Sequence, residues 1–330
     1  MVLNRKLKFV FNYCIGPILL IWLLYSIHHQ IQRQQDLGKA WQNIARSFAG
    51  PDRWIFLVVV LLMFVNWGIE AKKWQLLIRD IQQISFVKAF MAIFSGQAFA
   101  FNTINNVGEC FGKIMYLEEG NRLRAIGVTI IGNVSQLITT LAMGIVGLLY
   151  IKVAVLKNTE YMVGLSAFWL NGLIYVVSFG TLVLLLIYYC TSWITRIVEK
   201  IPIISKYTYL IQKMEGFHWK ELTLILFLSL TRFAVFVFQY LLLLHIFKVD
   251  ADFIQMGWMI CVMFLVFAVM PSIAMAELGI RGEVGKELLG LLSNNVLGIT
   301  FTTVLIWFIN RVIPAVAGSL FILGIRLFKK

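Results

Sequence analysis

The chain has 330 residues, of which 60% are hydrophobic and only 14% are charged, and its formal net charge is +13. An ordinary soluble domain is roughly half apolar with about a quarter of its residues charged, so this composition excludes one. The basic excess fits anionic lipid headgroups better than nucleic acid, because no polar stretch is long enough to form a basic domain. The four cysteines form no Cys/His cluster, so we expect no metal and no cofactor.

Six apolar runs approach or exceed the ~20 residues that a helix needs to cross a bilayer. In chain order they are Phe9–Ile27, Trp54–Ile69, Ile126–Ile151, Leu165–Cys190, Leu222–Phe247 and Leu297–Leu323. Bases precede the first run as in a signal peptide, but no small-residue cleavage site follows, which favours a signal anchor. The pattern predicts an all-α polytopic membrane protein with a single integral membrane domain over residues 1–330.

Two interruptions of similar composition break the apolar pattern, at Phe101–Gly120 and at Met270–Gly290. Each passes through small, Asn or Pro residues and then places Gly and Glu beside a base. Glu109 and Lys113 are four residues apart, as are Glu277 and Arg281, and the two pairs are separated by 168 residues, the difference between positions 109 and 277. Paired interruptions at corresponding positions of two halves are typical of the substrate site of a transporter.

The spacing predicts two inverted repeats, at about residues 1–157 and 158–330. Each half would hold three full crossings and one re-entrant hairpin, at about residues 86–124 and 254–292, which gives six transmembrane helices plus two hairpins. With this topology, fifteen Lys and Arg residues lie on the inner face and seven in outer loops. The positive-inside rule then places both termini in the cytoplasm, and we expect a bacterial inner membrane.

The hairpins supply most of the candidate site residues. Gly108 and Gly279 suit turns that redirect the chain, and Asn105 could satisfy non-helical backbone within the membrane. A helix that restarts after such a turn favours an anion such as a lipid phosphate. Lys113 and Arg281 could add charge-assisted hydrogen bonds. The alternative is that the two pairs are ordinary i,i+4 pairs on interfacial helices.

Further charged residues lie near or within the apolar segments. Arg232 and Arg311 are deep inside apolar runs, where a charge requires a polar cavity or a partner. We expect both to contact substrate, and the alternative is a structural ion pair with a hairpin glutamate. Glu283 could orient these bases or contact a cationic headgroup, as could Glu109. Glu70, Lys72, Lys73 and Trp74 are expected to anchor the end of their helix at the membrane interface.

Several of these segments resemble the flippase-like family named for the transmembrane domain of lysylphosphatidylglycerol synthase. The resemblance covers nearly the whole chain, and four segments carry it: Lys73-Trp74, NNVGECFGKIMYL, GNVSQLITTLAMGI and ELGIRGEVGKELLG. It implies that the membrane domain translocates an aminoacylated or otherwise modified lipid between leaflets. The soluble aminoacyl-transferase domain has no counterpart in this sequence, so a complete synthase is not expected.

The sequence therefore predicts a lipid flippase-like transporter that binds an anionic or aminoacylated phospholipid headgroup, or a lipid-linked one. One alternative is a membrane-embedded transferase that uses Glu109 or Glu283 as a base. Another is a non-transporting scaffold for envelope lipid or glycan synthesis. An enzyme is disfavoured because no nucleophile–base pair is visible. The expected partners are membrane lipids, with a homo-oligomer or an envelope-synthesis protein as further candidates.

Overall fold

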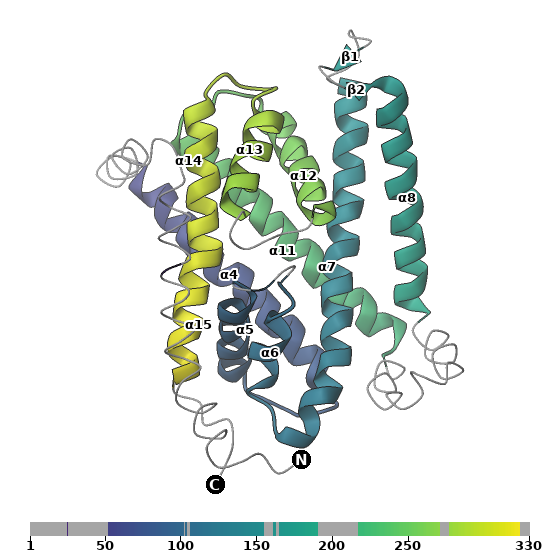
Figure 1. The fold of residues 1–330 in the computed structure, drawn as a ribbon, viewed down its shortest axis with the longest axis vertical. Helices are drawn as coiled ribbons and strands as arrows, with labels where there is room; N and C mark the ends of the chain where they lie inside the picture. The colour runs from purple at the N-terminus through teal and green to yellow at the C-terminus, as the bar shows by residue number, and fades with distance from the viewer. Residues whose placement is uncertain are drawn as a thin grey trace. The chain divides into compact units, whose positions relative to one another are not determined.

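The computed structural model describes residues 25, 52–101, 103, 106–154, 161–162, 165–190, 217–270 and 277–323. The described part is almost entirely helical (Figure 1). Its elements are α4 (Arg53–Ile78), α5 (Phe86–Ala100), α6 (Glu109–Ile114), α7 (Glu119–Ala154), β1 (Tyr161–Met162), β2 (Leu165–Ser166), α8 (Ala167–Tyr189), α11 (Trp219–Ile246), α12 (Phe253–Val269), α13 (Glu277–Leu289), α14 (Val296–Trp307), the π-helical turn η5 (Phe308–Val312) and α15 (Ile313–Leu323). The two short strands pair antiparallel.

Within these ranges, five helical segments are long and apolar enough to cross a membrane. They are Arg53–Ile78, Glu119–Val153, Phe168–Tyr189, Trp219–Ile246 and Val296–Leu323. Each coincides with one of the crossings expected from the sequence, and the remaining one, Phe9–Ile27, lies outside the described residues. The protein is an integral membrane protein, as predicted. The apolar helices α5 and α12 are shorter, at 15 and 17 residues.

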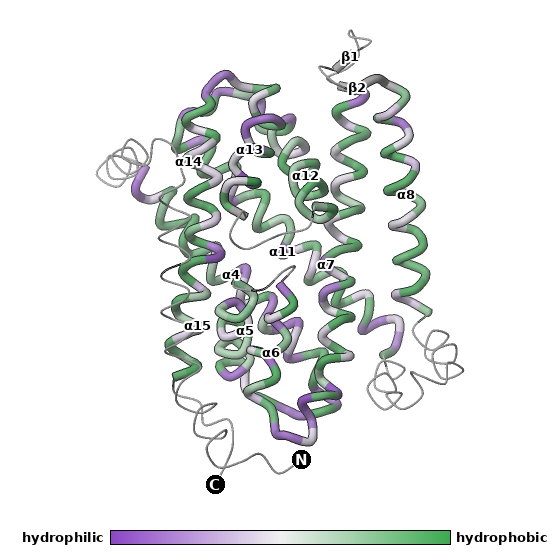
Figure 2. The backbone as a smooth tube through the Cα atoms, viewed as in Figure 1, coloured by the Kyte–Doolittle hydropathy of each residue, from purple (hydrophilic) through white to green (hydrophobic). Residues whose placement is uncertain are grey.

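Helix α8 is mainly apolar along its length (Figure 2). Large apolar side chains lie exposed on several helices, and α8 is the clearest case. Phe168, Tyr175, Val176 and Phe179 all present most of their surface. In water such a helix would lose the favourable free energy of apolar burial, whereas hydrocarbon tails accommodate it. This exposure pattern agrees with a helix surrounded by lipid.

The chain divides into two compact units that interleave along the sequence. Unit 1 comprises residues 1–126, 271–282 and 301–330, and unit 2 comprises residues 127–270 and 283–300. These units are defined by spatial contacts and are not the two sequence halves. The inverted repeat and the re-entrant placement of its hairpins therefore stay predictions.

In unit 1, α5 packs against α6 and α15 at very short range (Figure 1). A Cβ atom on Gly112 of α6 would collide with the carbonyl group of Ser95, and one on Gly318 of α15 would collide with that of Phe94. Glycine at both positions lets the helix backbones approach, the usual arrangement where apolar packing drives helix association in lipid. The Ser95 hydroxyl lies 2.9 Å from that of Tyr116 and donates to the Gly318 carbonyl at 3.4 Å.

Unit 2 is held by similar close packing together with polar contacts. Gly147 of α7 faces the Trp258 carbonyl of α12 at a distance that leaves no room for a side chain. The hydroxyls of Ser135 in α7 and Ser229 in α11 lie 2.8 Å apart and are fully buried. The Tyr188 hydroxyl of α8 donates to the carbonyl of Leu222 in α11 at 2.9 Å. The Ser135–Ser229 contact therefore joins α7 to α11 through polar side chains.

Helix α4 corrects one boundary and one interpretation. It ends at Ile78 rather than Ile69, and Glu70, Lys73 and Trp74 are buried inside unit 1. Interfacial anchoring of these three residues was therefore the wrong interpretation, although Lys72 is exposed as expected. The physical reason is pairing, because Glu70 and Lys73 lie one turn apart and bind one another. A paired helix can thus continue through positions that hydropathy alone assigns to a loop.

Candidate functional site: a buried ion network on α4 and α6

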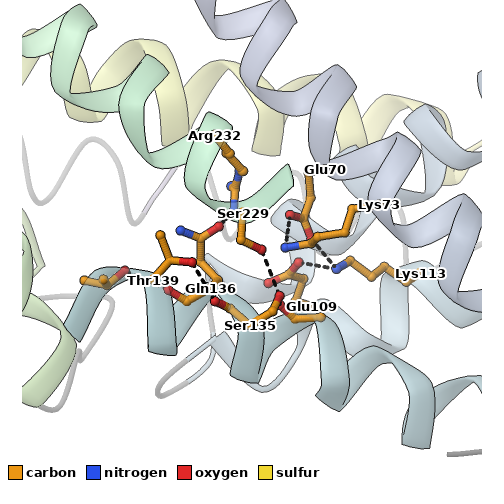
Figure 3. A network of polar contacts seen from close by, with 11 residues as sticks. Glu70, Lys73, Glu109, Lys113, Ser135, Gln136, Thr139, Ser229 and Arg232 are labelled. Atoms are coloured by element: carbon orange, nitrogen blue, oxygen red, sulfur yellow. Dashed lines mark hydrogen bonds and ion pairs between the residues drawn. The ribbon is translucent and has the colours of Figure 1, made fainter. Parts of the chain in front are cut away.

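Two carboxylates and two ammonium groups form a continuous network in unit 1 (Figure 3). Lys113 Nζ lies 2.6 Å from Glu109 Oε1 and 3.4 Å from Glu70 Oε1. The other oxygen of Glu70, Oε2, lies 2.8 Å from Lys73 Nζ. Lys113 therefore bridges a carboxylate on its own helix, α6, and one on α4. The order of contacts is Glu109, Lys113, Glu70, Lys73.

Burial makes this network unlike a surface ion pair. The side chains of Lys73 and Lys113 are each 1% exposed, and that of Glu70 is 4% exposed. Desolvating an ion costs several kcal/mol, which only close, well-placed partners offset. Two acids and two bases leave the network formally neutral. Glu109 is the most accessible of the four at 16% exposed, so the network opens toward its surroundings at this residue.

The turn before α6 places Glu109 against α5. The Gly108 amide donates to Thr103 Oγ1 at 2.8 Å, and a Cβ on Gly108 would lie 2.5 Å from the Phe99 carbonyl oxygen. Gly96 of α5 allows a second close approach, because a Cβ on Gly96 would lie 2.9 Å from the carbonyl oxygen of Glu109. These contacts fix the start of α6, and the i,i+4 spacing then directs Lys113 to the same face as Glu109. Gly108 lies at a turn, as the sequence suggested, but its backbone is right-handed helical and its role is to allow close approach to Phe99.

Arg311 brings a further cation to the same turn from the last membrane helix. Its Nη1 donates to Gln97 Oε1 at 2.9 Å, and its Nη2 donates to Asn106 Oδ1 at 2.5 Å. Asn106 has a φ of 58°, a left-handed conformation that Asn adopts more readily than most residues. The guanidinium therefore contacts both α5 and the turn that precedes α6. The alternative for Arg311, an ion pair with a hairpin glutamate, stays a prediction.

Arg232 lies on α11, in unit 2, and Figure 3 labels it together with Gln136. Its Nη1 donates to Gln136 Oε1 of α7 at 3.4 Å, and its guanidinium carbon lies 5.6 Å from the centre of the Phe236 ring. The ring face and the amide oxygen both favour the cation. Arg232 is thus held between two membrane helices, α7 and α11.

The second interruption presents its charges differently. Glu283 of α13 pairs with Lys286 at 2.9 Å, and their side chains are 70% and 36% exposed. Gly279 is exposed with open space around its Cβ position, and Arg281 is half-buried. Residues 271–276, the Glu277 side chain and Asn105 lie outside the described part of the structure. Of the residues proposed from sequence, the described structure therefore joins Glu109 to Lys113 directly, and Gly108 and Arg311 lie at the same turn.

Sequence reasoning missed three members of this region. Glu70 and Lys73 were assigned to the interface, and Gln97 was not considered. A signal for the first two was present, because Glu70-x-x-Lys73 is an acid–base pair at helical spacing, as is Glu109-x-x-x-Lys113. No comparable signal marks Gln97, an isolated amide in an apolar helix.

Comparison with protein families identifies this fold's relatives. The family described as the lysylphosphatidylglycerol synthase TM region matches residues 13–317, nearly the whole chain. This chain belongs to that family. Comparison with curated proteins gives no match. Membership in the lysylphosphatidylglycerol synthase TM family links the protein to lipid metabolism or transport, in agreement with its membrane helices.

Proposed function

We propose that this protein is a flippase-like transporter that binds an anionic or aminoacylated phospholipid headgroup, or a lipid-linked one, and moves it between leaflets. The observation that supports this best is the buried network of Glu70, Lys73, Glu109 and Lys113 within an apolar helical unit. Ionisable groups inside membrane proteins are costly and commonly mark substrate pathways. Family membership supplies the lipid context.

The chemistry of the network suits a headgroup that carries charge. A lipid phosphate could replace Glu109 as the partner of Lys113, since Glu109 is the most accessible member. Lys113 would keep its second contact to Glu70 during this exchange. The released Glu109 carboxylate would then orient the bases or accept an ammonium group from an aminoacylated headgroup. An ion network that exchanges partners avoids leaving a buried charge unpaired at any step.

Arginine side chains near the network could also bind the lipid phosphate through their planar guanidinium groups. A guanidinium can donate two parallel hydrogen bonds to phosphate oxygens, which an ammonium cannot. Arg311 lies at the turn before α6, and we assign it to the phosphate. Arg232, Arg281, Glu283, Asn105 and Gly279 stay proposed contacts to a lipid headgroup. Two re-entrant hairpins, over residues 86–124 and 254–292, would expose the site alternately to each leaflet.

Lipid movement in vesicles tests this function directly. The purified chain would be reconstituted with phosphatidylglycerol that carries a fluorescent acyl chain, and a membrane-impermeant quencher would report the lipid remaining in the outer leaflet. We expect Glu109→Gln and Arg281→Gln to abolish translocation while the protein keeps its fold. Lys72→Gln is the matched control for loss of a charge, because Lys72 is exposed and lies outside the network. Unchanged translocation in both site variants would contradict the proposal.

The same preparation separates movement from chemistry. Extraction of the lipids after incubation and analysis by mass spectrometry would reveal any new lipid product. A transporter leaves the labelled lipid chemically unchanged. A modified lipid would instead favour a membrane-embedded transferase, and activity that requires an added envelope protein would favour a scaffold.

A further inference from the structure

The last membrane helix contains one turn of π-helix, η5, between α14 and α15. The Ile313 amide donates to the carbonyl of Phe308, five residues back instead of four. Pro314 follows directly, and because it has no N–H it cannot form the regular helical bond to Asn310. The missing donor therefore lies immediately after the widened turn, which favours a bulge at this position.

The widened turn does not satisfy its own polar groups. Trp307 Nε1 and Asn310 Oδ1 are both buried, and neither has a hydrogen-bond partner among the described residues. The Asn310 amide nitrogen donates to the Ile306 carbonyl at 3.2 Å, so one end of that side chain is satisfied and the other is not. Unsatisfied buried polar atoms carry a free-energy cost. The bulge is thus not explained by its internal hydrogen bonding.

The clearest structural consequence of the π-helical turn is the direction of the Arg311 side chain. This residue lies within the π-helical turn, and its guanidinium donates both to Gln97 on α5 and to Asn106 in the following turn. The two acceptors are amide oxygens on one continuous stretch of chain, nine residues apart by number. Both contacts require the guanidinium to point toward α5 and the turn that leads into α6.

Both ends of the bulge are fixed against α5. On one side, the rings of Trp307 and Phe101, the residue that caps α5, are 5.8 Å apart between centroids. On the other side, Gly318 of α15 contacts the Phe94 carbonyl closely enough to exclude a Cβ. With both ends held, the winding between them sets the direction of Arg311. One residue of helix corresponds to a rotation of about 100°, so a change in winding would turn the side chain away from its acceptors.

We infer that Pro314 is a positioning residue for Arg311. By withholding one backbone donor it maintains the π-helical turn, and the turn directs the guanidinium to Gln97 and Asn106. The inference rests on the proposed function, where Arg311 binds the lipid phosphate. It goes beyond that function because it names Pro314 as the cause of the orientation of the Arg311 guanidinium.

Chemical crosslinking tests the orientation without measuring transport. The full chain, with its four native cysteines replaced by alanine, would carry Asn106→Cys and Arg311→Cys and react with a short bifunctional thiol reagent. Crosslinked protein would be quantified by mass spectrometry in three backgrounds: Pro314, Pro314→Ala and Leu320→Ala. Leu320 is an exposed residue of α15 beyond the bulge, so its variant controls for an alanine substitution in the same helix.

We expect efficient crosslinking with Pro314 and with Leu320→Ala, and a severalfold lower yield with Pro314→Ala. A thermal melt of each variant accompanies the assay, and Pro314→Ala should fold because it restores a regular helical donor. Equal crosslinking in all three backgrounds would overturn the inference. So would a yield that moves only in parallel with a lowered melting temperature, because that result would indicate a purely structural role.

Lipid translocation supplies a second, separable readout. Pro314→Ala should lower the rate as far as Arg311→Gln does, and the double variant should be no slower than Arg311→Gln alone, since both changes remove one interaction. Additive losses would contradict the positioning role. If Arg311→Gln leaves translocation unchanged while crosslinking still depends on Pro314, then the role of Arg311 in lipid binding fails and its positioning by Pro314 stands.

Discussion

The two interruptions share a sequence pattern and differ in how the fold treats their charges. In the first, Lys113 is buried and contacts Glu109 on its own helix and Glu70 on α4. In the second, Glu283 and Lys286 form a largely exposed pair within one helix, α13. An exposed pair contributes little to stability, whereas breaking a buried one leaves an uncompensated charge. The i,i+4 pair of the first interruption and the i,i+3 pair Glu283–Lys286 of the second therefore differ greatly in their contribution to stability.

The largest expected difference comes from removing the lysine of each pair. Lys113→Met leaves the carboxylates of Glu70 and Glu109 without their shared partner, and we expect a loss of about 3–5 kcal/mol in the free energy of unfolding. Lys286→Met is the matched variant and should change stability by no more than about 0.5 kcal/mol. Unfolding of both variants in the same detergent, followed by circular dichroism, measures the difference. Similar losses would remove the distinction between the two pairs.

Glycine substitutions compare the packing of the same two regions. Gly112→Ala places a methyl group against the Ser95 carbonyl, and such overpacking costs about 1–3 kcal/mol. Gly279→Ala adds a methyl group in open space within α13 and should stabilise by up to ~1 kcal/mol through helix propensity. Melting temperatures of the two variants should move in opposite directions. A stable Gly112→Ala protein would show that α5 and α6 can separate freely.

Ionic strength gives the smallest and most specific contrast. A double-mutant cycle on Glu283 and Lys286 should give a coupling of about 0.2–1 kcal/mol at low salt. That coupling should fall toward zero near 1 M salt, where the screening length is only about 3 Å. The coupling between Glu70 and Lys113 should persist at the same salt, because these side chains are buried. Equal salt sensitivity would indicate that water reaches both pairs.

Much of the architecture followed from local sequence. The apolar runs predicted all five membrane-length helices of the described structure, because bilayer thickness sets a length that hydropathy can detect. The Glu109–Lys113 pair was also predicted, since i,i+4 spacing places both residues on one helix face whatever the surroundings. The resemblance to the lysylphosphatidylglycerol synthase family was correct as well.

Other features could not be predicted in this way. Glu70 and Lys73 were placed at the interface because a charged segment after an apolar run usually marks the end of a membrane helix. The burial of Glu70 and Lys73 depends on a contact with Lys113, which lies 43 positions after Glu70 in the sequence. The contact of Arg311 with Gln97 joins residues 214 positions apart. Neither contact leaves a local periodicity, so neither could be inferred from spacing.

The sequence by itself determined that this chain lies in a membrane, which apolar runs form its long helices, and that two charged interruptions break the apolar pattern. These properties depend on composition and spacing, which act along the chain. Only the tertiary structure decided that the first interruption is part of a buried, neutral ion network while Glu283 and Lys286 in the second stay exposed. Close helix approach at Gly96, Gly112 and Gly318 underlies that difference, because it surrounds α5 with neighbouring helices and encloses the network in protein.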